Sequence, residues 1–287
     1  RLKAMAKINL GLDVLGKRED GYHEVRMIMQ TIHLYDLLEI QKIREPEIQI
    51  VSNLSFLPVN ENNLVYKAAR LLQEEFALTD GISVKLTKRI PVAAGMAGGS
   101  TDAAAMLYAM NQLYDLGLSR RELMKRGVQI GADVPYCLMR GTALAEGIGE
   151  KLTQLPPMIK CPVLIAKPSI SVSTKFVYQN LKLDEQTNHP DIDALMKDIR
   201  EKDFDGVCAH MGNVLESVTI PNYPVIAEIK QQMMRSGAKA SMMSGSGPTV
   251  FGLFEDGETA KRALREMKRS GLAKQVYLTT IYNNRRK

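Results

Sequence analysis

The sequence contains no tryptophan and only 6% aromatic residues, and it has no apolar stretch long enough to span a membrane. Its three cysteines, Cys137, Cys161 and Cys208, lie far apart and form no C-x-x-C pair. An odd number of isolated cysteines argues against a disulfide framework and a zinc site, and it favours a reducing compartment. The chain also shows no secretory signal pattern, so we expect a cytoplasmic protein with no membrane partner.

The remaining composition is that of an ordinary globular protein, with 45% hydrophobic and 24% charged residues among 287. This length favours two domains, which we place at residues 1–157 and 158–287, joined at Leu155-Pro156-Pro157. Strand and helix patterns are mixed in both halves, which predicts an α+β architecture. Separate strands are expected over about 22–32 and near 36–43. One helix is expected to be capped at Asn60–Asn63, and another to begin with a capping box at Ser119–Glu122. The net charge of +6 favours anionic partners such as a nucleotide, a phosphorylated substrate or a nucleic acid, but the basic residues are spread along the chain.

The segment Pro91–Met110 begins as a small-residue loop and continues as a helix. The loop glycines lack a Cβ atom and can adopt positive φ: Gly95, Gly98 and Gly99. We expect Ser100 or Thr101 to cap the helix. Amide groups at a helix N-terminus form an anion site, which makes phosphate binding one interpretation. A tight turn with close helix packing is the other, because the spacing matches neither the P-loop nor the Rossmann fingerprint.

Two further segments carry candidate polar residues. In the strand predicted over 5–15, Lys7, Asn9 and Asp13 lie on the face opposite the apolar residues. Local reasoning favours solvent exposure on an edge strand, with a cleft as the alternative. His23 begins the next strand, and a lone histidine is more often a hydrogen-bonded surface residue than a functional one.

The turn Gly131–Pro135 holds Asp133 in an apolar setting between two predicted elements. The carboxylate could cap a turn, or it could act as a partly desolvated acid or base. The residues alone leave both roles open.

Three motifs in this order resemble those of the GHMP small-molecule kinases: Ala6–Leu10, Pro91–Ala103 and Met243–Phe251. The resemblance runs from Ala6 to the last predicted strand. It implies a two-domain fold with a ribosomal-protein-S5-domain-2-like N-terminal domain and a ferredoxin-like C-terminal domain. It also implies ATP as the phosphate donor, which raises the weight of phosphate binding at the loop.

Two other segments, Asp20–Glu24 and Gly131–Pro135, are similar to one subgroup of that family. Its members phosphorylate the 2-hydroxyl of a cytidylyl methylerythritol in the non-mevalonate isoprenoid pathway. The resemblance implies that Asp133 is the general base, and that Lys7 keeps it ionised and stabilises charge on the reacting oxygens. Asp102 is a rival carboxylate, but its place near the start of a helix is explained by the helix dipole.

The resemblance also implies binding residues. ATP would be held by Asn63 and Lys88 near adenosine and by the phosphate loop: Pro91, Val92, Ala93, Ala94, Gly95, Met96, Ala97, Gly98, Gly99, Ser100 and Thr101. Ser100 or Thr101 would lie near Mg²⁺. The cytidylyl substrate would contact Tyr22 and His23 on one wall, Thr174 and Tyr178 on the opposite wall, and Asn9 near its diphosphate or erythritol region.

The loop departs from the subgroup pattern. Gly-Leu-Gly-Gly-Gly-Ser-Ser is usual there, whereas this chain has Gly95-Met96-Ala97-Gly98-Gly99-Ser100-Thr101. Leu to Met is nearly neutral in volume, and Ser to Thr keeps the hydroxyl. Alanine at position 97 is free of strain only if its φ is negative.

Two other functions are possible alternatives for this sequence. A homoserine or mevalonate kinase is the nearest alternative, and the Tyr22-His23 pair and the Gly131–Pro135 turn argue against it. An RNA-binding module is a remote alternative, but no basic stripe interleaved with aromatics is present. We therefore expect a small-molecule substrate, no nucleic-acid partner, and a monomer or homodimer.

Overall fold

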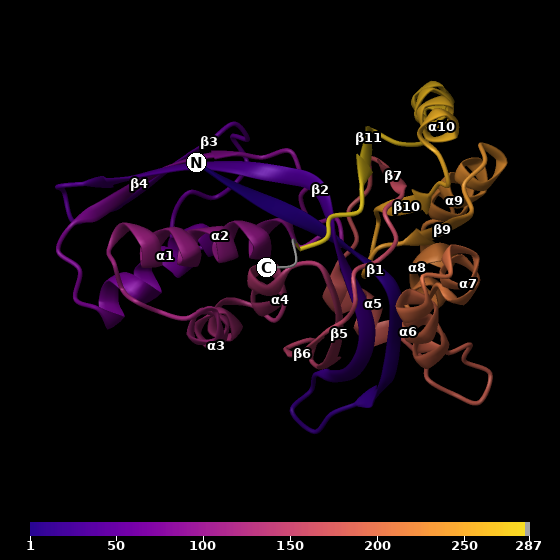
Figure 1. Cartoon of the computed structure of the whole chain (residues 1–287), viewed down its shortest axis with the longest axis horizontal. Coiled ribbons are helices and arrows are strands. Elements are labelled where there is room, and N and C mark those ends of the chain that lie inside the picture. The colour runs from indigo at the N-terminus through magenta and orange to yellow at the C-terminus, as the bar shows by residue number, and fades with distance from the viewer. Residues whose placement is uncertain (285–287) are drawn as a thin grey trace. The chain divides into compact units, whose positions relative to one another are not determined.

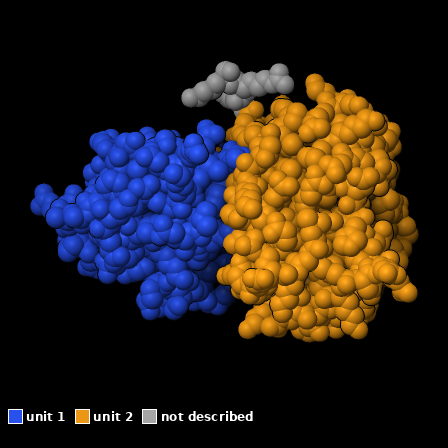
Figure 2. Space-filling model, turned by 90° about the horizontal axis from the view of Figure 1, so that it is seen from below, with its two compact units in different colours: residues 1–6, 34–92, 97–139 blue, residues 7–33, 93–96, 140–287 orange. Residues whose placement is uncertain are grey.

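The computed structural model describes residues 1–284, which form two compact units. Unit 1 comprises Arg1–Ala6, Leu34–Val92 and Ala97–Met139, and unit 2 comprises Lys7–His33, Ala93–Met96 and the chain from Arg140 onward. Figure 1 labels the elements, and Figure 2 shows unit 1 in blue and unit 2 in orange. The units are interleaved along the chain, whereas the domains expected at 1–157 and 158–287 are consecutive. That domain boundary stays a prediction.

Two long strands, β1 (Leu2–Lys17) and β2 (His23–Ile43), each contribute residues to both units. Within unit 1, the last part of β2 pairs antiparallel with β4 (Gly81–Thr87), and β4 pairs parallel with β3 (Ile48–Ser52). Within unit 2, the first part of β2 pairs with β5 (Thr142–Gly147), β5 pairs with β6 (Lys151–Gln154), and β1 pairs with the short β8 (Gly212–Asn213).

Four helices complete unit 1: α1 (Leu64–Glu75), α2 (Gly98–Leu113), α3 (Arg120–Ile130) and α4 (Val134–Met139). The predicted helix starts are confirmed for α1, where Asn63 caps Val65 N, and for α3, where Ser119 and Glu122 form a capping box. α1 packs on α2, and fully buried residues such as Leu72 and Leu107 supply the core.

Unit 2 contains a four-stranded antiparallel sheet in the order β11-β7-β10-β9. Its strands are β7 (Pro162–Lys167), β9 (Ala240–Met243), β10 (Val250–Leu253) and β11 (Gln275–Thr280). α9 (Val225–Arg235) packs on β9 and β10, and α10 (Gly257–Ser270) packs on β7 and β11 (Figure 1). The remaining helices are α5 (Thr174–Asn180), α6 (Ile192–Glu201), α7 (Phe204–His210) and α8 (Glu216–Asn222).

Three sequence-based expectations need correction. The two strands expected near 22–32 and 36–43 are one continuous β2, because exposed His33 and partly exposed Tyr35 alternate with buried Leu34 and Asp36 without a break. The side chains of Lys7 and Asn9 are buried rather than exposed. β1 lies between β2 and β8 and is not an edge strand, and residues 244–248 lie against this face, with a Cβ atom on Gly245 at 3.6 Å from Asn9 Oδ1. Asp13 is also buried, and its Oδ1 contacts Nδ1 of His189 at 2.6 Å.

The third correction concerns α2. The cap position is occupied by Ala97, not by Ser100 or Thr101, and no side chain caps the helix. Both hydroxyl residues lie inside the first helical turn, because Gly98 and Gly99 are already helical. Across residues 1–284, none of the helices combines the length and the apolarity needed to cross a bilayer.

Candidate active site

The loop before α2 has an unusual backbone. Ala93, Gly95 and Ala97 all lie in the left-handed region, with φ of 49°, 72° and 54°. Left-handed residues at alternate positions turn successive amide N–H groups toward one side, which creates a concave anion-binding surface. α2 begins directly afterwards, and its first amides lack intrahelical partners. The local conformation therefore suits a phosphate group.

Ala97 resolves the question that the sequence left open. Its φ of 54° is positive, so the methyl group occupies a backbone conformation that favours glycine. Its carbonyl oxygen accepts the first helical hydrogen bond, from Thr101 N at 2.8 Å. The substitution of alanine for glycine is accommodated, at the cost of local backbone strain.

In unit 2, β1 places Lys7 and Asn9 next to the part of this loop that belongs to the same unit. The Lys7 ammonium donates to Asn9 Oδ1 at 2.7 Å, and Asn9 Nδ2 contacts Met27 Sδ at 3.2 Å. Lys7 N donates to the Met96 carbonyl oxygen at 3.2 Å. The two predicted site residues of β1 are thus paired with each other, beside the segment Ala93–Met96.

The second glycine-rich loop, 244–248, lies against the first within unit 2. Ser244 Oγ donates to the Gly95 carbonyl oxygen at 3.0 Å, and a Cβ atom on Gly95 would lie 2.0 Å from the Ser244 carbonyl oxygen. Asn213 Nδ2 donates to the carbonyl oxygens of Met243 and Gly245 at 2.9 and 2.8 Å. The approach of the two loops requires glycine at position 95.

Among the residues of unit 2 predicted to contact cytidine, two are in direct contact with each other. The rings of His23 and Tyr178 are in contact, with centroids 5.0 Å apart and planes inclined by 43°. Thr174, one turn from Tyr178 on α5, shares a hydrogen bond of 2.8 Å with Ser246 through their hydroxyl groups. Tyr22 is 60% exposed. Burial, and then repulsion by Lys17, lower the pKa of His23, so its ring is neutral near pH 7.

In unit 1, Asp133 lies in the turn between α3 and α4, and its carbonyl oxygen accepts from Cys137 N at 3.1 Å. The residue is partly exposed. A Cβ atom placed on Gly131 would lie 4.0 Å from Ser100 Oγ. The turn that carries the predicted base therefore lies beside the first turn of α2.

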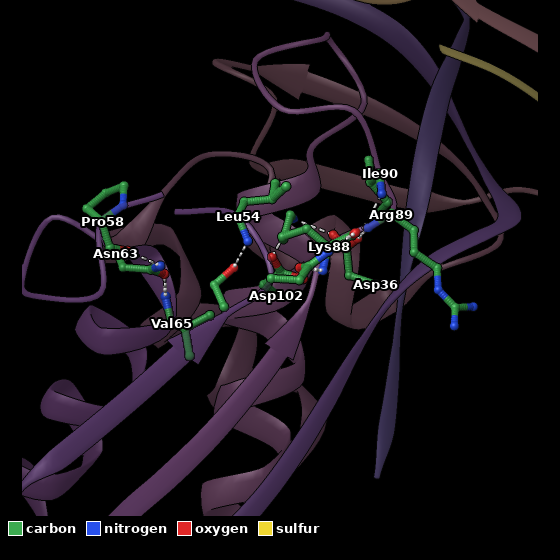
Figure 3. A network of polar contacts seen from close by, with 11 residues as sticks. Asp36, Leu54, Pro58, Asn63, Val65, Lys88, Arg89, Ile90 and Asp102 are labelled. Atoms are coloured by element: carbon green, nitrogen blue, oxygen red, sulfur yellow. Dashed lines mark hydrogen bonds and ion pairs between the residues drawn. The ribbon is translucent and has the colours of Figure 1, made fainter. Parts of the chain in front are cut away.

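Lys88 sits in a buried ionic cluster (Figure 3). Its ammonium donates to Asp36 Oδ2 and, at 2.6 Å, to Asp102 Oδ2, with all three side chains at most 4% exposed. Burial alone would lower the pKa of Lys88, but attraction by Asp102 and Asp36 outweighs it and raises that pKa. Burial and then the nearby Asp36 charge raise the pKa of Asp102, against the pull of Lys88.

These contacts and those of Asn63 change the interpretation of two residues. Asp102 is explained by its ion pair with Lys88 and not by the helix dipole. Both polar atoms of the Asn63 side chain are already hydrogen-bonded: Oδ1 accepts from Val65 N at the start of α1, and Nδ2 donates to the Pro58 carbonyl oxygen (Figure 3). Adenosine contacts by Asn63 and Lys88 stay predictions.

Sequence reasoning missed Asp36. A signal was present, because Asp36 stands at an apolar-face position between Leu34 and Leu38 in an alternating strand. A carboxylate at such a position needs a buried partner.

Within residues 1–284, no three His, Cys, Asp or Glu side chains are grouped so that they could hold a metal ion.

Comparison with known proteins identifies similar chains over the full length. Models of the GHMP kinases N terminal domain and of the GHMP kinases C terminal match residues 63–141 and 195–273. A 4-diphosphocytidyl-2-C-methyl-D-erythritol kinase of Lachnospira eligens is 60% identical, over 98% of each chain. The kinase of the same name from Lachnoclostridium phytofermentans is 56% identical, over 99% of this chain and 98% of its own.

Solved structures give the same picture of the fold. A crystal structure of 4-(cytidine 5'-diphospho)-2C-methyl-D-erythritol kinase superposes with a TM-score of 0.85 at 31% identity, over 99% of both chains. An L. major mevalonate kinase reaches a TM-score of 0.76 at 14% identity, over 99% of this chain and 97% of its own. The second likeness concerns the fold alone. The α+β, two-domain architecture expected from the sequence is confirmed.

Proposed function

The chain belongs to the GHMP kinases, and from that premise we propose that it phosphorylates 4-diphosphocytidyl-2-C-methyl-D-erythritol at the 2-hydroxyl, with ATP as donor. The observation that carries this proposal is 60% identity to a kinase of that name over 98% of both chains. The reaction would serve isoprenoid precursor synthesis by the non-mevalonate route. We expect the protein to work in the cytoplasm, as a monomer or homodimer.

ATP binding is assigned to the loop from Pro91 to Thr101. Phosphoryl transfer depends on positioning and charge neutralisation more than on covalent help from the protein. The left-handed conformations of Ala93, Gly95 and Ala97, followed directly by α2, support a backbone cradle for the phosphate oxygens. Asn63 and Lys88 would flank the adenosine end.

Mg²⁺ is the expected companion of ATP. This ion usually keeps several waters and takes one or two protein oxygens together with phosphate oxygens. The lack of a metal-ligating cluster among residues 1–284 is compatible with that mode, and Ser100 or Thr101 could supply the protein oxygen. When bound, the ion would neutralise charge on the phosphates.

The chemical step is assigned to Asp133 and Lys7. The Asp133 carboxylate would accept the proton of the 2-hydroxyl as that oxygen attacks the γ-phosphorus, while the bond from the γ-phosphorus to the β,γ-bridging oxygen breaks and ADP leaves. Lys7 would stabilise negative charge on the transferred phosphoryl oxygens, and its hydrogen bond to Asn9 holds the ammonium in a fixed direction. If Asp133→Asn kept near-normal kcat with a native fold, the assignment of the base would be wrong.

Substrate recognition is assigned to unit 2. The neighbouring rings of His23 and Tyr178 would bind the pyrimidine by stacking and hydrogen bonding. Thr174 and Asn9 would contact more polar parts of the substrate, and Tyr22 is exposed enough to close over it. The L. major mevalonate kinase is 14% identical and a homoserine kinase from Cytophaga hutchinsonii is 21% identical, which supports only a common architecture.

The direct test is ADP release from a panel of acceptors. Purified protein with Mg²⁺ and ATP would be offered the cytidylyl methylerythritol, mevalonate, homoserine and galactose. We expect turnover of the first alone. Turnover of another acceptor with comparable kcat/KM would refute the proposed substrate, and salt-dependent RNA binding without turnover would favour the remote alternative.

A further inference from the structure

The segment that leads into the phosphate loop has no regular secondary structure, yet its backbone is fixed. It follows β4 and covers Lys88–Ile90. Asn53 clamps Lys88 from both sides: Asn53 Oδ1 accepts from Lys88 N at 2.7 Å, and Asn53 Nδ2 donates to the Lys88 carbonyl oxygen at 3.1 Å. Asp36 Oδ1 accepts from the next two amides, Arg89 N and, at 2.8 Å, Ile90 N.

Asp36 is also connected, through Lys88, to α2, the helix that follows the loop. Its other oxygen accepts from the Lys88 ammonium, which in turn donates to Asp102 on α2 (Figure 3). Asp102 Oδ1 is buried and has no hydrogen-bond partner among the described residues, whereas Asp102 Oδ2 accepts from the Lys88 ammonium and joins the helix to the cluster. One fully buried carboxylate thus joins the entry of the loop to the helix that follows it.

Gly98 allows α2 to lie this close. A Cβ atom on Gly98 would lie 3.3 Å from the Lys88 ammonium and 3.2 Å from Ile90 Cγ2. The start of α2 therefore rests directly on the two residues that Asp36 holds. A shift of Lys88–Ile90 would move both ends of the phosphate loop relative to each other.

On these contacts, we propose that Asp36 is a positioning residue for ATP: it fixes Lys88, Arg89 and Ile90 so that the phosphate loop and the first turn of α2 keep the spacing that ATP requires. This inference rests on the proposed function, in that it takes ATP to be the ligand of the loop. Asp36 itself would not touch the nucleotide.

The test is the variant Asp36→Asn, with binding of a non-hydrolysable ATP analogue measured by calorimetry and KM measured for both substrates. Losing a buried charge-assisted hydrogen bond should weaken analogue binding and raise KM for ATP by about tenfold, with KM for the cytidylyl substrate changed by less than about twofold. Equal changes in the two KM values, or unchanged analogue affinity, would overturn the proposal. Analogue binding needs no acceptor, so it is informative even if the proposed substrate is not turned over.

Coupling through Lys88 gives a second readout. Because Asp36 acts partly through that ammonium and partly through the amides of Arg89 and Ile90, the loss of analogue affinity in the double variant Asp36→Asn/Lys88→Met should be smaller than the sum of the two single losses. Fully additive losses would contradict the proposed route. Asp198→Asn is the matched control, because Asp198 is 7% exposed and paired with His210 in unit 2. It should lower thermal stability without a selective effect on ATP.

Asn53→Ala covers the case in which Asp36→Asn does not fold. Asn53 is an exposed residue that holds the same segment by two hydrogen bonds to the Lys88 backbone. We expect this variant to weaken analogue binding by about threefold. Unchanged affinity would show that ATP does not need the segment to be held, and it would overturn the proposal by itself.

Discussion

At the scale of single residues, Ala97 carries a methyl group at a backbone position suited to glycine. Replacing it by glycine should raise the free energy of unfolding by about 0.5–1 kcal/mol, because the relief of left-handed strain exceeds the added entropy of the unfolded chain. The control is Ala109→Gly, inside α2, which should lower stability by about 1 kcal/mol. Chemical denaturation measures both, and a destabilised Ala97→Gly protein would contradict the positive φ.

His23 provides a prediction for pH. Its pKa is lowered from 6.5 by burial and by Lys17, so the neutral ring persists somewhat below that pH. KM for the cytidylyl substrate should therefore be flat from about pH 8.5 to about pH 6.5, and it should change only as the ring gains a proton at lower pH. The lowered pKa also makes folding depend on pH. The unfolded chain binds this proton more readily than the folded chain, so the free energy of unfolding decreases as the pH falls through the pKa that His23 has in the unfolded chain.

The check is the variant His23→Phe, followed by steady-state kinetics across that pH range. It should raise KM for the cytidylyl substrate far more than KM for ATP, and it should remove the acid-side change. A His23→Phe enzyme with the wild-type pH profile would assign the titration to another group.

At the scale of elements, the contact between the two glycine-rich loops depends on Gly95. A side chain there would meet the Ser244 carbonyl oxygen at 2.0 Å and would strain a backbone with φ of 72°. Gly95→Ala should therefore raise KM for ATP by about tenfold or more and lower the melting temperature.

The matched control is Gly16→Ala in β1, where an added Cβ atom meets nothing within 4 Å and φ is not positive. It should leave both KM for ATP and the melting temperature close to their original values. Equal effects of the two substitutions would show that the contact with Ser244 does not shape the phosphate loop.

Elements with local signals could be predicted from the sequence. Asn63 and the Ser119–Glu122 capping box marked the starts of α1 and α3, because these helix caps join residues only two or three apart. The continuity of β2, and the strands β6 and β8, depend on pairing with distant segments. The two-residue β8 forms by pairing with β1 and has no sequence pattern of its own.

At the scale of the whole molecule, the order of the motifs was sufficient to predict the family and the two-domain fold. The Asp36–Lys88–Asp102 cluster was not predictable in the same way, because its members lie 52 and 14 residues apart and meet only once the sheet and α2 have packed. The ring contact of His23 with Tyr178 is another case, since the sequence placed these residues on opposite walls. The order of the motifs indicates the family to which the chain belongs, whereas these contacts depend on how the folded elements pack.

The most direct test of the central claim is the position of the phosphate in the product. The protein, Mg²⁺ and ATP would be incubated with 4-diphosphocytidyl-2-C-methyl-D-erythritol, and the products followed by ³¹P NMR. The account predicts a new phosphomonoester on the 2-hydroxyl, an intact cytidylyl diphosphate and an equal amount of ADP. Phosphorylation at another hydroxyl, cleavage of the diphosphate, or ATP consumption without a phosphomonoester would contradict it.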